Sequence, residues 1–144
     1  MKPEHSEKSI GCKSIREWNE LWTPLSGGFK TKHPELSNSV GLARAVLNGQ
    51  TMYILRGTEH LHGGIEKSLQ RIRGKAQTGN SGYGAQMIRK HIHELQLEIL
   101  VIGCGLTAVE PTKALKKALV KLVNPLWNMP HLKRMAMLHA GKPS

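Results

Sequence analysis

The chain contains no aspartate, and all ten of its acidic residues are glutamate. This excludes any site built on aspartate, such as an EF-hand calcium loop or an Asp-dependent catalytic triad. Aromatic residues are also scarce, at 4% of the sequence. No apolar run reaches the ~18 residues that a membrane span requires, so we expect no membrane partner.

Cysteine is almost as scarce, with only Cys12 and Cys104 in the chain. Two cysteines do not make the disulfide framework of a small secreted domain. The N-terminal stretch from Met1 to His5 also lacks the apolar core of a signal peptide. These features predict a reduced, cytoplasmic protein.

Positive charge is what the sequence has in excess: 21 Lys and Arg residues give a net charge of +11. Basic side chains displace counterions from phosphates, so this balance favours a polyanion partner. We expect DNA first and RNA as the alternative. The segment from Pro111 to Ser144 contains no acid at all, which predicts a strongly cationic C-terminal end.

Local patterns predict a single α/β domain, since 144 residues are typical of one domain. Ser14 and Glu17 form a capping-box pattern at the start of a helix that continues to Trp22. Asn48-Gly49 is a strong signal for a two-residue hairpin turn. A glycine-rich loop is expected from Gly74 to Gly84. The periodicity places the main elements in β-β-α-α-β-α order. These are strands 39–46 and 50–57, helices 63–73 and 85–95, strand 97–102 and a helix from residue 111. We expect the apolar face of that last helix to be Leu115, Leu119, Leu122 and Val123.

Three short motifs occur in this frame: Gly41-Leu42-Ala43 on the first strand, Tyr53-Ile54-Leu55 on the second, and Pro125-Leu126-Trp127-Asn128 after the last helix. Their order and spacing resemble those of the GIY-YIG nuclease family. The resemblance covers roughly residues 40–130. It implies a small three-stranded sheet flanked by helices over residues 39–130, an N-terminal helical extension over 1–38 and a basic C-terminal tail over 131–144.

The sequence departs from this family at the positions that carry its chemistry. The tyrosine of the first motif is Ala43, and the glycine of the second motif is Leu55. The arginine of the first helix falls on Ser68, with Arg71 one turn later. The metal-binding glutamate, twelve residues before Asn128, is Lys116. A charged lysine has no lone pair to offer, so it cannot hold Mg²⁺.

These departures favour a protein that binds nucleic acid on a nuclease-like domain without cutting it. We expect no cofactor and no metal site. His60/His62 and His91/His93 are too poor in further ligands to make such a site. The expected nucleic-acid-binding residues are Arg44, Tyr53, Arg56, Arg71, Arg73, Lys116 and Asn128.

Two alternatives remain at this stage. One is an active Mg²⁺-dependent endonuclease with relocated catalytic groups, for which Tyr53, Arg71 and Glu110 are the candidates. The other is a protein-interaction or inhibitor module whose basic face meets an acidic protein.

Overall fold

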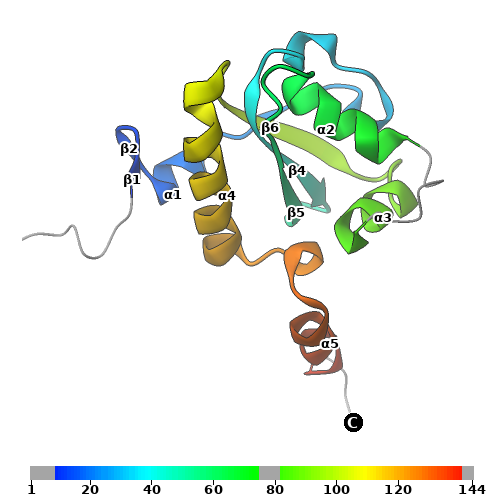
Figure 1. Cartoon of the computed structure of the whole chain (residues 1–144). Coiled ribbons are helices and arrows are strands. Elements are labelled where there is room, and N and C mark those ends of the chain that lie inside the picture. Colours follow the sequence, from blue (N-terminus) through cyan, green and yellow to red (C-terminus); the bar gives the residue numbers. More distant parts are fainter. Residues whose placement is uncertain (1–8, 75–81, 141–144) are drawn as a thin grey trace, which may run out of the picture.

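A four-stranded antiparallel sheet forms the centre of the computed structural model, which describes residues 9–74 and 82–140 (Figure 1). The strands lie in the order β3-β6-β4-β5. Their bounds are Thr23–Pro24 for β3, Val40–Leu47 for β4, Gln50–Gly57 for β5 and Gln96–Gly103 for β6.

Helices cover both faces of this sheet, which makes the chain a mixed α/β fold. Figure 1 shows α1 (Ile15–Trp18) and α4 (Val109–Val123) on one side. On the other side lie α2 (Gly64–Arg73) and α3 (Tyr83–Lys90). The last helix, α5 (His131–Ala140), follows α4 through a one-turn 3₁₀ helix, η6 (Leu126–Asn128).

The expected β-β-α-α-β-α order is present, but the expectation of a three-stranded sheet is wrong. Thr23 and Pro24 pair with Ile99 and Glu98, so β3 adds a fourth, two-residue strand beside β6. A separate two-stranded sheet joins β1 (Ser9–Ile10) to β2 (Lys13–Ser14). Strands this short carry too little periodicity to be recognised in a sequence.

Strands β4 and β5 form a long hairpin, and its turn lies at Asn48-Gly49 as expected. Asn48 and Gly49 have φ angles of 51° and 79°, the left-handed conformations that a two-residue hairpin turn requires. The register pairs Leu42 with Arg56 and Ala43 with Leu55. Successive residues point to opposite faces of the sheet, so each strand contributes to two separate apolar layers.

The core consists of one apolar cluster on each face. Ala43, Leu55, Ile65, Leu69 and Ile88 belong to the cluster beneath α2 and α3. The cluster beneath α4 and α1 contains buried side chains from all of the long strands and both helices: Ile15, Leu42, Ile54, Leu100, Leu115 and Leu119. The sheet therefore separates two sets of residues that are close together in the sequence.

The N-terminal helix begins as its capping box predicts. The Glu17 amide donates to the Ser14 hydroxyl at 3.1 Å, and the Ser14 amide donates to the Glu17 carboxylate at 2.7 Å. The helix ends at Trp18 rather than Trp22. The Trp22 ring is instead held by a hydrogen bond from its Nε1 to Asn19 at 3.0 Å.

The bounds of α3 and the burial of one α4 residue also differ from expectation. Helix α3 spans Tyr83–Lys90 and not 85–95, because a turn stabilised by a bond between His91 and Glu94 replaces its expected second half. In α4, Leu115 and Leu119 are buried as expected, whereas Leu122 is 39% exposed. Most of the loop expected between Gly74 and Gly84 lies outside the described residues.

None of the helices within residues 9–74 and 82–140 combines the length and the apolar character needed to cross a bilayer.

We expect Gly84→Ala to lower the free energy of unfolding by about 1–3 kcal/mol, since its Cβ would overlap the Tyr53 ring. The matched control is Gly82→Ala, because Gly82 has an extended backbone and open space around it. Urea denaturation of both variants checks this. Equal stabilities of the two variants would contradict the close packing of α3 on β5.

Candidate functional site

The side chain of Asn128 pairs with the backbone of β5 at one point on its outer edge. The Ile54 amide donates to Asn128 Oδ1 at 2.7 Å, and Asn128 Nδ2 donates to the Ile54 carbonyl at 3.0 Å. The amide group therefore pairs with β5 as a further strand would. This contact places η6 against the sheet beside α4.

Helix α4 lies against the same face as Arg56 and presents a series of lysines there. Lysines three or four positions apart share one side of a helix, and each turn advances by about 5.4 Å. A hollow of about 450 Å³ lies between these lysines, β5 and η6. It is lined by Arg56, Lys113, Lys116, Lys117, Val120 and Asn128.

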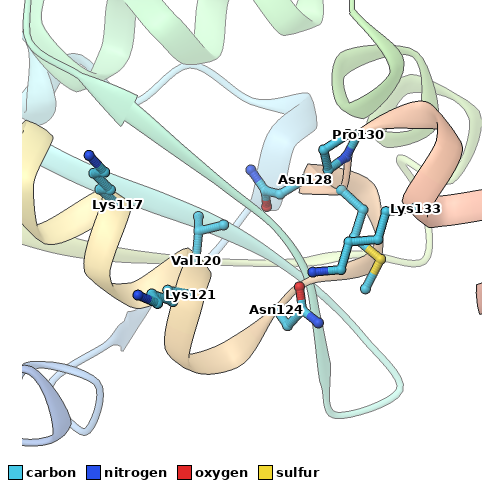
Figure 2. Close-up of a pocket in the computed structure, with 8 residues that line it drawn as sticks. Lys117, Val120, Lys121, Asn124, Asn128, Pro130 and Lys133 are labelled. Carbon is cyan, nitrogen blue, oxygen red and sulfur yellow. The ribbon is translucent and has the colours of Figure 1, made fainter.

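A second hollow of about 280 Å³ adjoins the first and shares Lys117, Val120 and Asn128 with it. Figure 2 shows Lys117 and Lys121 projecting from α4, with Asn128 between α4 and the segment that carries Lys133. We call the two hollows together the basic trough. None of the described residues that line it is acidic.

The position of Lys133 depends on the way α5 is attached. Arg134 is buried and donates from Nη1 to the Met129 carbonyl at 3.0 Å. Its guanidinium lies 3.6 Å from the centre of the Tyr83 ring, a cation–π contact that ties α5 to α3. The neighbouring Lys133 side chain is exposed and lines the trough.

Lys116 has the most perturbed environment among the trough lysines. Burial lowers the pKa of its amine below the ordinary value of 10.5, and the nearby Arg56 guanidinium lowers it further. Both causes disfavour the charged ammonium. Arg56 is itself exposed, and its backbone is fixed because the Ser68 hydroxyl donates to its carbonyl at 2.9 Å.

Three of the expected site residues therefore come together: Arg56, Lys116 and Asn128. The first two present cationic groups to the trough. Both polar atoms of the Asn128 amide are occupied by the Ile54 backbone. The primary contribution of Asn128 is thus to hold the wall of the trough in place.

Arg44 lies on the same face of the sheet but is not part of the trough. Its Nε donates to Glu98 at 2.8 Å, and its guanidinium lies over the Trp22 ring at 4.6 Å. The side chains of Arg44 and Glu98 are only 18% and 13% exposed. Arg44 therefore forms a largely buried cross-strand ion pair.

Tyr53 points to the opposite face, where it packs against the cluster beneath α2 and α3. Burial raises the pKa of its hydroxyl above 10.0, which makes proton transfer at neutral pH harder. Glu110 lies on α4, on the other side of the sheet, with its carboxylate 3.5 Å from Lys113. The sheet thus separates Tyr53 from Glu110.

The other two expected arginines are paired with carboxylates. Arg71 forms an ion pair with Glu59 and is 60% exposed. Arg73 forms an ion pair with Glu66 and donates to the Thr31 carbonyl at 2.9 Å. Neither residue lines the basic trough.

Four basic residues of the trough were not among the expected site residues: Lys113, Lys117, Lys121 and Lys133. A signal for them exists in the sequence, because all four lie in the acid-free segment that begins at Pro111. The acid-free composition does not say that Lys133 shares a surface with the lysines of α4, since that depends on where η6 places α5.

The trough does not fit the divalent metal that the family resemblance implies for an active nuclease. Its charged groups are ammonium and guanidinium groups, which have no lone pair to donate to Mg²⁺. Elsewhere within the described ranges, no cluster of three or more His, Cys, Asp or Glu side chains is arranged to hold a metal ion.

We expect Asn128→Ala to destabilise the protein by about 1–3 kcal/mol, because it leaves both Ile54 backbone groups without their partner. The control is Asn124→Gly, which changes the other trough asparagine but suits its left-handed backbone at φ 56°. Thermal unfolding compares the two. A loss as large in Asn124→Gly would argue against a specific role for the Asn128 amide.

Lys116→Met is expected to raise the melting temperature at pH 7, because charged Lys116 is disfavoured in the folded state. The lowered pKa fixes the direction: the cost is full below the folded pKa and disappears as pH rises toward 10.5. Melting curves between pH 7 and 10.5 should show the two proteins converging. A difference that is independent of pH would indicate an effect of packing alone.

Comparisons of the chain with protein-family models, with curated proteins and with solved structures gave no match.

Proposed function

We propose that the chain binds nucleic acid through the basic trough, on a nuclease-like domain that lacks the usual catalytic residues. The observation that carries this proposal is the trough itself. Six basic residues from β5, α4 and α5 line it, and no acid does so among the described lining residues: Arg56, Lys113, Lys116, Lys117, Lys121 and Lys133.

Phosphate is the group that this lining suits. Ammonium and guanidinium groups bind phosphate oxygens by charge-assisted hydrogen bonds, and a run of them along a helix can follow a polyanion. The net charge of +11 adds attraction at long range. Phosphate contacts carry no direct sequence information, so we infer binding with little base readout.

The proposal is for binding rather than cutting because of the residues at the positions of the family's chemistry. Ala43 and Leu55 both pack in the apolar cluster beneath α2 and α3. Lys116 lies in the trough, at the position that the family resemblance assigns to a metal-binding glutamate. The relocated candidates Tyr53 and Glu110 lie on opposite sides of the sheet.

The proposal predicts that binding weakens steeply with salt. The logarithm of the association constant should fall linearly with the logarithm of salt concentration, with a slope of roughly −0.9 for each duplex phosphate neutralised. Fluorescence anisotropy with labelled duplex DNA, single-stranded DNA and RNA measures this. Absence of affinity for all three at low salt would refute the proposal.

Single substitutions locate the interface. We expect Lys117→Ala, Lys121→Ala and Lys133→Ala each to weaken binding and to reduce the salt slope by about 1. Lys90→Ala is the matched control, because Lys90 is an exposed lysine on α3, across the sheet from the trough. Equal losses in Lys90→Ala would indicate attraction by net charge without a defined site. A pull-down of an acidic protein that survives nuclease treatment would instead favour a protein partner.

A further inference from the structure

Lys116 differs from the other trough lysines in that partial burial and a neighbouring guanidinium, that of Arg56, both lower its pKa. Arg56 approaches it from β5, and Lys113 and Lys117 flank it on α4. The side facing η6 is formed by Asn128, which is neutral. The described lining residues of this hollow include no carboxylate that could hold the Lys116 proton.

This environment increases the fraction of Lys116 that is a neutral amine, which is the nucleophilic form of lysine. Partial burial and the Arg56 guanidinium both lower the Lys116 pKa. Desolvation and an adjacent cation are the two features that activate a lysine for attack on carbonyl carbon. The Arg56 guanidinium can bind a phosphate beside that amine.

The hollow is also large enough to hold more than a phosphate. Its volume is about 450 Å³, within the range of roughly 300–1,000 Å³ that is typical of small-molecule sites. Val120 contributes an apolar wall. A sugar-sized group attached to a phosphate would fit in such a space.

We propose that Lys116 forms a reversible imine with the aldehyde of a phosphate-bearing ligand whose phosphate is held by Arg56 and Lys117. The aldehyde could belong to an abasic site in nucleic acid or to a small phosphorylated aldehyde, since both present the same groups. The inference rests on the proposed function only in that the same trough holds phosphate.

The step conserves atoms and electrons without an external oxidant or reductant. The Nζ lone pair of Lys116 forms a bond to the aldehyde carbon, and the carbonyl π electrons move to its oxygen. The two amine protons and that oxygen then leave as water, which gives a carbon–nitrogen double bond. Hydrolysis reverses the step and returns the free lysine.

The first experiment uses the full chain and pyridoxal 5′-phosphate as a small phosphorylated aldehyde. The aldehyde is added below one equivalent at pH 7, the imine is reduced with borohydride, and the labelled peptide is mapped. We expect Lys116 to carry most of the label, ahead of Lys113, Lys117 and Lys121. This competition among lysines of the unaltered protein does not depend on any variant folding.

The second experiment uses a duplex with one abasic site, trapped with borohydride and analysed on a denaturing gel. Lys116→Arg removes the primary amine, so it should lower the trapped yield per duplex bound at least about tenfold. Lys90→Arg, across the sheet, should trap as the unaltered protein does.

The outcomes separate the two proposals. Trapping at Lys116 in either experiment supports the imine, and the arm that reacts identifies the source of the aldehyde. Labelling spread evenly over surface lysines, together with no Lys116-dependent trapping of abasic DNA, would overturn it. Duplex binding without trapping would overturn the imine and leave the proposed function standing. Trapping of pyridoxal 5′-phosphate at Lys116 without any duplex binding would support the imine and overturn the proposed function.

Discussion

The paired hydrogen bonds between the Asn128 amide and the Ile54 backbone are the contact on which the rest of the site depends. They join residues 74 positions apart and fix η6 against the last strand of the sheet. The left-handed residue Asn124 ends α4 just before this contact. This contact holds η6 in place as the second wall of the trough, and α5 begins directly after it.

Three of the arginines expected at the site differ from the trough cations in having a carboxylate partner. Arg44, Arg71 and Arg73 each have a glutamate partner, so their charges are already compensated. The trough gathers cations with little compensation; Glu110, 84% exposed, reaches Lys113 at 3.5 Å. Bringing like charges together opposes folding, and an anion in the trough would relieve that repulsion.

Much of the fold was predictable because its signals are local. The turn at Asn48-Gly49 and the capping box of Ser14 and Glu17 each depend on residues within a few positions, and both are as expected. The end of α3 was not predictable, because buried Leu95 continues the helical spacing of apolar residues although the backbone has already turned at His91.

The site was less predictable than the fold, for a related reason. Arg44 was expected on a basic surface, but it pairs with Glu98 on the neighbouring strand β6. The register of the two strands sets this pairing. Tyr53 and Arg56 are three positions apart on one strand, so the pleat sends their side chains to opposite faces. Lys133 faces the trough only because buried Arg134 fixes α5.

The two edges of the sheet are each occupied in part, in different ways. Asn128 occupies the backbone of β5 at Ile54, and β3 covers part of β6 with two residues, of which Pro24 has no amide hydrogen to offer. A polyanion can gather many copies of a basic protein at high local concentration. Because these contacts leave fewer free backbone groups at the edges, a second copy held nearby finds less to pair with, which opposes association of copies through their sheets.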